Sequence, residues 1–417
     1  MNKIEVKTEL NDNKLPEGWK RVRLGEVLKY EQPYKYIVKN TQYEETGIPV
    51  LTAGKTFILG FTVEEDGIYT NLPVIIFDDF TTESKYIDFP FKVKSSAMKF
   101  LKKKDNNIVL KFVFENMQLV KFPSLGGDHK RRWISEFQYF QVPLPPLTEQ
   151  RKITEILETV DETIEKTDAI IEKYKRIKQG LMQDLLTRGI DENGQIRSEK
   201  THNFKDSPLG RIPEEWKVVE LGEVAKIKRG ASPRPIDNPI YFSENGRGWI
   251  RIQDVSSSYK YLTGTFQYLS KIGEQKSVSI EPGELIMSIC ATIGKSIILK
   301  IPACIHDGFV AFKDLSNEVD TDFLYYCLDF REKEIREMRQ IGTQGNLNSK
   351  LVALFKVIEP PLPEQCCIAE VLSQIDETIE KEHKYKEKLE RIKLGLMEDL
   401  LTGKVRVNLL IKEGLDR

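Results

Sequence analysis

The stretch PPLTEQRKITEILETVDETIEKTDAIIEKYKRIKQGLMQDLLT occupies residues 145–187, and PPLPEQCCIAEVLSQIDETIEKEHKYKEKLERIKLGLMEDLLT occupies residues 360–402. The two copies are identical at 26 of 43 positions. A second pair precedes them, because LPEGWKRVRLGEVLK at 15–29 returns as IPEEWKVVELGEVAK at 212–226, with ten of fifteen positions identical. The offsets are 197 and 215 residues, far beyond the roughly 20–50 residues of a solenoid repeat. The duplication therefore predicts a pseudo-dimer within one chain.

Each copy carries an amphipathic helix, because its apolar residues recur at alternating spacings of three and four positions, the pattern of a coiled-coil seam. Each helix begins after a Pro-Pro pair and ends at Gly189 or Gly403. About forty residues at a rise of about 1.5 Å give a rod of roughly 60 Å. We expect the two rods to pack antiparallel through matching seams. The seam residues are Ile153, Leu157, Val160, Ile164, Leu181, Leu185, Ile368, Leu372, Ile375, Ile379, Leu396 and Leu400.

Two glycines interrupt the helices at equivalent positions, Gly180 and Gly395. Gly inside a helix costs about 1 kcal/mol relative to Ala. The pair marks either a close helix crossing or a surface position that tolerates Gly, and both interpretations stay open.

The segments between the repeated blocks, roughly 30–144 and 227–359, share little sequence that can be aligned by eye. Both contain short β-branched and aromatic runs separated by Gly, Pro and Asn, which predicts β-rich modules. The predicted strands are GIPVLTAG, TFILGFTV, LPVIIFDDF, NIVLKFVF and FQYFQVPL in the first module, and GRGWIRIQDV, GELIMSIC, KSIILKI and GFVAFK in the second. Helical periodicity appears in the second module at 322–340.

The composition is that of a folded protein, since 40% of the 417 residues are hydrophobic and 30% are charged. The five Cys form no C-x-x-C pair and the four His form no H-x-x-x-H pair, so we expect no disulfide framework and a cytoplasmic location. No secretory signal core and no run of eighteen apolar residues is present, which argues against export or membrane insertion.

Two fragments imitate catalytic motifs without the required spacing. Ile293–Ser296 resembles the end of a phosphate-binding P-loop, but Ile289 stands where the first Gly is needed, so we predict a turn between strands. Asp79, Glu83 and Lys85 are the residue types of a metal-dependent nuclease, although carboxylates four positions apart barely permit a turn. We predict no catalytic residue, no metal and no cofactor, with the nuclease as the alternative hypothesis.

The 63 basic and 64 acidic residues give a net charge of -1, but the positive charge is local. Six Lys and no acidic residue lie between Lys92 and Lys104, and HKRRW follows at 129–133. In the second module, four basic residues and no acidic residue lie between Lys226 and Arg234. Basic residues beside aromatic ones suit phosphate anchoring and base-edge readout. A solvated basic face is the alternative for any one cluster, but its occurrence in both modules favours nucleic acid.

The order of these blocks resembles the specificity subunit of type I restriction-modification systems. Each module is preceded by P-E-x-W-K-x-V-x-L-G-E and followed by a P-P-L-x-E-Q helix that ends in G-L-M-x-D-L-L-T, from about Leu15 to Thr402. The resemblance implies two target recognition domains, each reading one half of a bipartite double-stranded DNA sequence. It also implies that the helices dock two adenine-methylating modification subunits and the restriction subunits, and that the chain itself is not an enzyme.

The predicted fold is α+β, with two β-rich α/β target recognition domains separated by two long antiparallel helices that form a coiled-coil-like spacer. The expected division is residues 1–147 for the first recognition domain, 148–188 for the first helical spacer, 189–211 for a linker, 212–362 for the second recognition domain, 363–403 for the second spacer and 404–417 for a C-terminal tail.

No family motif assigns the residues that contact DNA, so we choose them by composition. The DNA-binding candidates are Lys55, Lys85, His129, Lys130, Arg131, Arg132, Arg229, Arg234, Arg247, Arg251, Gln253, Lys295, His306, Gln344 and Asn346. A third hypothesis, a structural coiled-coil adaptor without a role on DNA, predicts no salt-dependent DNA binding.

Overall fold

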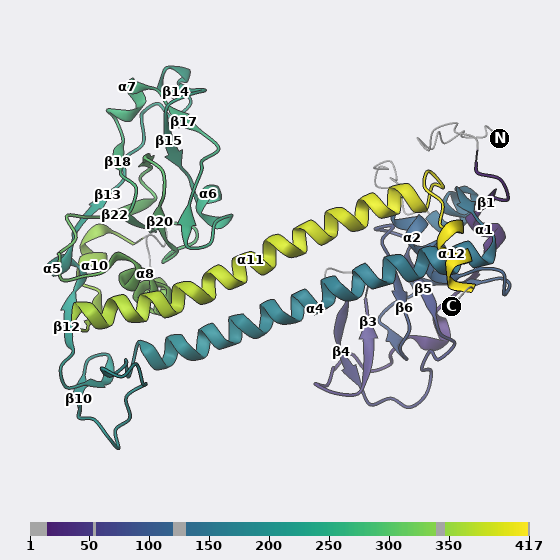
Figure 1. The fold of residues 1–417 in the computed structure, drawn as a ribbon, viewed down its shortest axis with the longest axis horizontal. Coiled ribbons are helices and arrows are strands. Elements are labelled where there is room, and N and C mark those ends of the chain that lie inside the picture. Colours follow the sequence, from purple (N-terminus) through teal and green to yellow (C-terminus); the bar gives the residue numbers. More distant parts are fainter. Residues whose placement is uncertain (1–14, 53–55, 120–130, 339–346, 416–417) are drawn as a thin grey trace. The chain divides into compact units, whose positions relative to one another are not determined.

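The computed structural model describes residues 15–52, 56–119, 131–338 and 347–415 (Figure 1). The chain forms two compact units, of which unit 1 comprises Met1–Asp168 and Lys384–Arg417 and unit 2 comprises Ala169–His383. The boundary between the units falls inside both long helices. Each unit is therefore built from one β-rich module and a segment of each helix.

The two repeated blocks form the helices α4 (Leu147–Leu185) and α11 (Leu362–Leu400), each 39 residues long. Both helices begin directly after the Pro-Pro pair. Past their ends, Gly189 and Gly403 adopt positive φ angles of 63° and 77°, which a residue with a side chain rarely adopts. The predicted helices and their glycine stops are confirmed.

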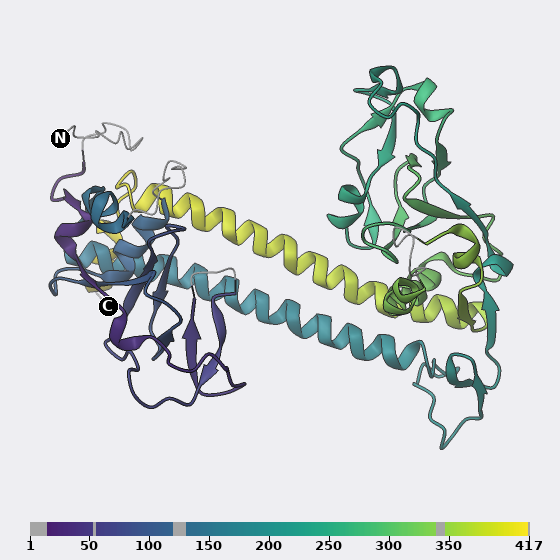
Figure 2. The same ribbon diagram turned by 180° about the vertical axis from the view of Figure 1, so that it is seen from behind.

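Inside each unit the segments of α4 and α11 run side by side in opposite directions (Figures 1 and 2). In unit 1, Lys393 Nζ lies 2.6 Å from a carboxylate oxygen of Asp161. In unit 2, Lys178 Nζ lies 2.8 Å from a carboxylate oxygen of Asp376. Asp161 and Asp376 are equivalent in the duplication, as are Lys178 and Lys393. The antiparallel pairing predicted from the matching seams is confirmed, with the same ion pair in both units.

The module of unit 1 is held to α4 by a two-stranded ladder, β1 (Lys20–Arg23) with β9 (Gln141–Leu144). Its main sheet is antiparallel, in the order β2 (Leu28–Glu31), β8 (Met98–Lys103), β5 (Val74–Asp78) and β6 (Ser84–Ile87). A second sheet contains β4 (Ile58–Thr62), β3 (Ile48–Leu51) and β7 (Lys92–Val93). The smaller helices of the unit are α1 (Leu24–Val27), α2 (Leu110–Leu119), α3 (Arg132–Ser135) and α12 (Asn408–Leu415).

The module of unit 2 begins with the hairpin β10 (Phe204–Ser207) and β11 (Gly210–Pro213), inside and just after the expected linker, and with the ladder β12 (Lys217–Glu220) to β23 (Lys356–Glu359). The first five-stranded sheet has the order β13 (Lys226–Arg229), β22 (Phe309–Lys313), β19 (Leu285–Ser288), β20 (Ser296–Leu299) and β16 (Tyr261–Leu262). The second has the order β14 (Phe242–Ser243), β17 (Tyr268–Leu269), β15 (Arg247–Ile250), β21 (Ala303–Ile305) and β18 (Val278–Ile280). The helices of this module are α5 (Leu221–Val224), α6 (Ile252–Ser256), α7 (Lys271–Glu274), α8 (Thr321–Phe330), α9 (Glu332–Glu337) and α10 (Ser349–Ala353).

The two modules share a strand topology that their sequences do not reveal. The order β2-β8-β5-β6 of unit 1 matches β13-β22-β19-β20 of unit 2, and every neighbouring pair is antiparallel. In the second sheets, β3 is antiparallel to β4 and parallel to β7, just as β15 is antiparallel to β17 and parallel to β21. Unit 2 adds β16 at the edge of β20. The duplication therefore includes the modules.

Two predictions are decided by local geometry. The run NIVLKFVF was predicted as a strand, which is wrong, because helix α2 begins at Leu110 and buries Leu110, Val113 and Met117 on one face. A short apolar run has no clear period, so length and tertiary packing decide between helix and strand. The helical region predicted at 322–340 is confirmed as α8 and α9.

The close helix crossing at the two glycines is also wrong. Gly180 and Gly395 are exposed, and a Cβ added at either position would meet no described atom within 4 Å beyond its neighbours and its own helix backbone. Both are surface positions that tolerate Gly. The predicted turn at Ile293–Ser296 is confirmed between β19 and β20, where the N–H of Gly294 donates to the carbonyl of Ser288 at 2.9 Å.

Candidate nucleic-acid interface and its framework

A buried Glu-Trp-Arg cluster ties each module to the start of its long helix. In unit 2, Glu364 accepts hydrogen bonds from Trp216 Nε1 at 3.1 Å and from Arg197 Nη2 at 3.1 Å. In unit 1, the equivalent Glu149 accepts from Trp19 Nε1 at 3.3 Å and from Arg406 Nε at 3.2 Å. A carboxylate that is buried this deeply needs charged and polar donors to offset its lost hydration. The repeated P-E-x-W-K and P-P-L-x-E-Q motifs are thus two halves of one contact.

The next residue of each long helix is a glutamine, and its side chain binds the backbone of a neighbouring loop in both units. Gln150 accepts from the N–H of Val109 at 2.9 Å and donates to the carbonyl of Pro145 at 2.9 Å. Gln365 accepts from the N–H of Asp320 at 2.9 Å and donates to the carbonyl of Pro360 at 2.8 Å. Each glutamine therefore fixes the loop before α2 or α8 against its long helix.

The predicted seam residues divide between buried and partly buried positions. The buried ones are Ile153, Leu157, Leu185, Ile368, Leu372, Ile379 and Leu400, while Val160, Ile164, Leu181, Ile375 and Leu396 are partly buried. Ile153 and Leu157 join the core of the unit 1 module, and Ile368 and Leu372 join that of unit 2. At their first turns the long helices therefore pack on the modules as well as on each other.

Two of the basic residues of unit 2, Arg229 and Arg234, contact one acidic residue, Asp307. Its carboxylate pairs with Arg234 Nη2 at 3.1 Å and accepts from the Ser232 hydroxyl at 2.7 Å. Its carbonyl accepts from Arg229 Nε at 3.0 Å. The side chains of Arg229 and His306 line the same small cavity of about 120 Å³. The Ser232 hydrogen bond lowers the pKa of Asp307, so its negative charge persists and holds Arg234 at the surface, while its carbonyl holds Arg229.

An exposed arginine lies against a buried tryptophan at the end of β15. The guanidinium of Arg251 lies 5.3 Å from the ring centroid of Trp249, and its Nη1 donates to Gln267 Oε1 at 3.1 Å. Stacking on a rigid ring restrains the guanidinium and keeps its remaining donors available. Gln253 lies exposed in the short helix α6 that follows.

Two other candidates of unit 2 have different surroundings. Arg247 is mostly buried between Glu274, whose carboxylate lies 3.1 Å away, and Glu281. Its guanidinium therefore serves the fold of the module. Lys295 is half-buried in the turn after Gly294.

His306 is held as a neutral ring, because its Nδ1 accepts from the N–H of Gly308 at 2.8 Å. Burial lowers the pKa of His306, and the charge of Arg251 acts in the same direction against the opposing charge of Asp307. The ring also lies edge-on to Phe309, with ring centroids 4.9 Å apart. This histidine therefore presents Nε2–H as a donor at neutral pH.

In unit 1, Arg131 is exposed at the start of α3, Arg132 is half-buried in its first turn and Lys85 is exposed on β6. Arg131 lies beside Asp79, a buried carboxylate that accepts from the N–H of Trp133 at 3.0 Å. Burial raises the pKa of Asp79, which the Trp133 hydrogen bond and the charges of Lys99 and Arg131 oppose. Five candidates lie outside the described residues: Lys55, His129, Lys130, Gln344 and Asn346.

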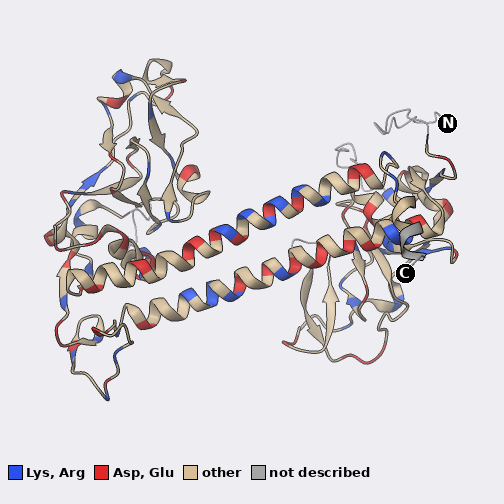
Figure 3. Ribbon diagram, viewed as in Figure 1, with Lys and Arg blue, Asp and Glu red and all other residues tan. Residues whose placement is uncertain are grey.

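The lysine-rich run of unit 1 does not form one surface. Lys92 is buried and its Nζ lies 2.6 Å from Glu64, and Lys99 is buried with its Nζ 3.8 Å from Asp79. Lys94 and Lys103 are exposed. Strand alternation and local ion pairs therefore divide the run between core and solvent. Figure 3 marks the positions of basic and acidic residues along the ribbon.

The alternative nuclease site is not assembled. The Asp79 side chain is buried beside Trp133, whereas Glu83 and Lys85 are exposed and line a shallow depression together with Asp78. Asp307 is not among the predicted residues, because the DNA-binding candidates are all basic residues, glutamine or asparagine. Its neighbours in the sequence, His306 and Gly308, could have indicated it, because they form a tight turn against Arg229.

Comparison with known proteins gives the class of the chain. The sequence matches the type I restriction modification DNA specificity domain twice, over residues 16–176 and 213–391. These matches cover most of the chain, which therefore belongs to this family. It is a DNA-specificity component of a restriction-modification system and not a catalytic subunit, so the enzyme hypothesis is wrong.

Two relatives in this family are similar to the chain over most of its length. The chain is 35% identical over 368 residues to the type I restriction enzyme EcoR124I/EcoR124II specificity subunit of Escherichia coli, with 85% of each chain covered. It is 29% identical over an alignment of 430 residues to the type I restriction enzyme MjaVIII specificity subunit of Methanocaldococcus jannaschii, with 96% of each chain covered.

The fold is shared with a solved S subunit of a type I restriction-modification system from M. genitalium. The TM-score is 0.62 at 16% identity, with 94% of this chain and 97% of that chain covered. The likeness confirms the predicted architecture of repeated domains and long helices. Within the described part of the chain, no helix is both long and apolar enough to span a bilayer.

Proposed function

We propose that each unit reads one half of a bipartite double-stranded DNA sequence and that the two half-sequences differ. The supporting observation is the contrast between framework and module. The Glu-Trp-Arg clusters, the glutamines and the helix ion pairs recur at equivalent positions, whereas the exposed residues of the two modules do not. A shared support that carries two different polar surfaces suits two readers of different sequence.

Within unit 2, we assign base-edge contacts to Arg251 and Gln253 and phosphate contacts to Arg229 and Arg234. A planar guanidinium that is restrained on a ring can donate two parallel hydrogen bonds to guanine, and a glutamine amide can do the same to adenine. The two arginines at Asp307 are held at the surface but keep donors, which suits phosphate oxygens.

We further propose that the long helices dock the modification subunits and the restriction subunits of the complex in a cytoplasmic setting. Their exposed apolar residues recur in the duplication: Ile170 and Tyr385 are equivalent and are 40% and 47% exposed, and Ile177 and Ile392 are equivalent and are 38% and 43% exposed. Two equal apolar sites on one chain suit two copies of one partner.

The experiment measures DNA binding by the chain in complex with its modification subunits. Affinity for duplex DNA that carries the methylated sequence should fall steeply with salt, and Arg234→Ala should reduce the slope by about 1. Arg247→Ala is the matched control, because the Arg247 side chain is 18% exposed and held between two carboxylates, whereas that of Arg234 is 68% exposed, and it should leave the slope unchanged. Absence of salt-dependent binding would favour the adaptor hypothesis.

A further inference from the structure

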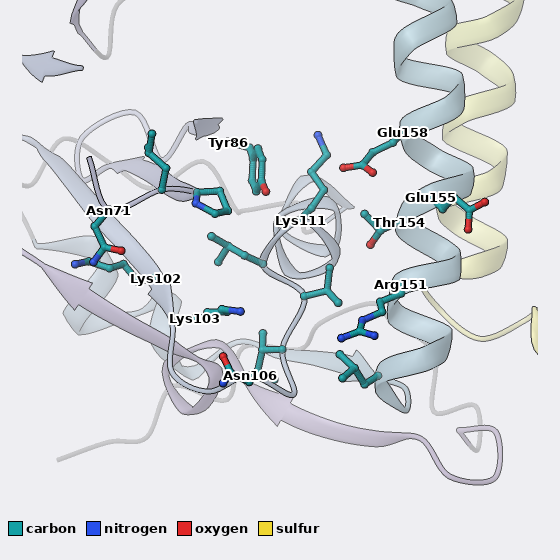
Figure 4. Close-up of a pocket in the computed structure, with 16 residues that line it drawn as sticks. Asn71, Tyr86, Lys102, Lys103, Asn106, Lys111, Arg151, Thr154, Glu155 and Glu158 are labelled. Carbon is teal, nitrogen blue, oxygen red and sulfur yellow. The ribbon is translucent and has the colours of Figure 1, made fainter. Parts of the chain in front are cut away.

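A cavity of about 570 Å³ in the unit 1 module lies between β6, the loop before α2 and the first turns of α4 (Figure 4). Tyr86, Lys111 and Glu158 gather at one end of it, and Lys103, Asn106 and Arg151 lie toward the other. β6 is the last strand of its sheet within the described residues. One wall of the cavity is therefore formed beside an open strand edge, which can pair with a further strand.

The internal duplication shows what fills the equivalent place in unit 2. There the edge strand β20 is covered by β16, which pairs with it in parallel. The N–H of Ile298 donates to the carbonyl of Lys260 at 3.0 Å, and the N–H of Lys300 donates to the carbonyl of Leu262 at 2.9 Å. Ile298 lies opposite Leu285 in the same register in which Tyr86 lies opposite Ile75. The edge at Tyr86 thus matches the edge that β16 covers.

The side chains around β16 also have counterparts in unit 1. Lys260 Nζ lies 2.5 Å from Asp322 and donates to the Ser373 hydroxyl at 2.7 Å. The position of Asp322 corresponds to Lys111, because each stands two residues after the amide that a framework glutamine binds. The position of Ser373 corresponds to Glu158 in the repeated helix. In unit 2 the first of these positions is the carboxylate of Asp322, which pairs with Lys260 just before β16. In unit 1 the same position is a cation, Lys111.

The charged residues that line the cavity indicate which kind of added strand would bind at β6 of unit 1. The cavity is lined by four cations, Lys102, Lys103, Lys111 and Arg151, against two carboxylates, Glu155 and Glu158. Lys102 is paired with Glu31, Lys111 Nζ lies 3.3 Å from Glu115, and Glu155 is 3.0 Å from Lys152 Nζ. Lys103 and Arg151 are exposed, and against them stands the single carboxylate of Glu158. An acidic strand is favoured by this balance and a basic one is disfavoured.

We propose that this cavity is a docking site for an extended, acidic peptide segment of a partner protein, which adds a strand in parallel to β6 and places a carboxylate at Lys111. Main-chain hydrogen bonds supply affinity and the alternate side chains supply specificity in this mode of recognition. The site belongs to unit 1 and includes none of the unit 2 residues that we assign to DNA, so it does not depend on that assignment.

The probe is a labelled peptide copied from unit 2, residues 258–265 (SYKYLTGT), in which Lys260→Glu provides the carboxylate. Its binding to the full chain is measured by fluorescence anisotropy. It should bind about tenfold more tightly than the unchanged peptide, because the change replaces a like-charge contact by an opposite-charge one. Equal affinity of the two peptides, or no binding of either, would overturn the proposal.

Two controls separate strand pairing from nonspecific charge. N-methylation of the peptide at residues 260 and 262, whose amides face the edge strand, should abolish binding, whereas N-methylation at 261 and 263 should be tolerated. In the chain, Lys111→Asp combined with Glu115→Tyr copies the Asp322 and Tyr326 of unit 2 and should reverse the preference toward the unchanged peptide. If that variant does not fold, the two N-methylated peptides still distinguish strand pairing from nonspecific charge attraction.

A second copy of the chain is the competing occupant. It would appear as concentration-dependent dimerisation in analytical ultracentrifugation that the acidic peptide does not compete, and that result would overturn the assignment to an acidic partner. Dimerisation should be absent if the site is free for the peptide.

Discussion

The Glu-Trp-Arg cluster of unit 2 gives the largest stability effect that we predict for a single residue. Glu364→Ala removes a carboxylate that accepts from Arg197, from Trp216 and from the N–H of Ile190 at 3.0 Å. The Arg197 side chain is 9% exposed, so its buried charge keeps only the half-exposed Glu215, whose carboxylate lies 3.4 Å from its Nε. Breaking a buried pair in this way costs about 3–5 kcal/mol, and the unpaired donors of Trp216 and Ile190 act in the same direction.

The assay is thermal unfolding followed by calorimetry and by tryptophan fluorescence. Unit 2 spans Ala169–His383, and a domain of this size loses about 2–4 °C per kcal/mol, so its transition should fall by about 6–20 °C. Glu364→Gln should recover part of this loss, because the amide oxygen still accepts from Trp216.

The matched control is Glu149→Ala in unit 1. Its partner Arg406 has a side chain that is 30% exposed, so water can replace the lost carboxylate. The expected cost is about 1–3 kcal/mol. Equal shifts for the two Ala variants, or a loss below about 1 kcal/mol for Glu364→Ala, would refute the assignment of the difference to burial.

Three further perturbations test other parts of the molecule. The depressed pKa of His306 means that the unfolded chain takes up a proton near pH 6.5 while the folded chain does not. Unit 2 should therefore be fully stabilised above that pH and lose stability as the pH falls through it. His306→Asn should remove this dependence in urea unfolding measured as a function of pH. Lys393→Ala and Lys178→Ala should have similar costs in the same assay, about 1–3 kcal/mol each, because each lysine bridges an aspartate of the other helix and a second carboxylate, Glu115 at 3.6 Å from Lys393 and Asp329 at 3.7 Å from Lys178. Four residues inserted at matched positions of α4 and α11 add about 6 Å of helix, so the methylated half-sequences should stay unchanged while the spacer between them grows by one or two steps of about 3.4 Å.

The duplicated framework was predictable because both of its signals are local in sequence. The 3–4 periodicity fixes the helices, and the Pro-Pro and Gly boundaries fix their ends. The antiparallel ion pair of Asp161 with Lys393 then follows from the symmetry of two similar segments. These features recur as similar runs of sequence, so a comparison of the two halves of the chain finds them.

The shared topology of the modules was not predictable in the same way. Strand pairs such as β5 with β8 join residues that are distant in sequence, and the apolar core accepts many sequences of the same pattern. The lysine run shows the same limit, because the burial of Lys92 and Lys99 depends on Glu64 and Asp79, which other strands supply. The arginines at Asp307 were found by composition, but their arrangement comes from the fold.

The assignment of one half-sequence to each unit is tested most directly by mapping methylated adenines in cells. Residues 227–355 of the chain would be exchanged for the corresponding module of another family member, with the framework left intact. We predict that one half of the methylated sequence changes while the other half and the spacer length stay the same. Changes in both halves, or an unchanged methylated sequence, would contradict independent reading by the two units.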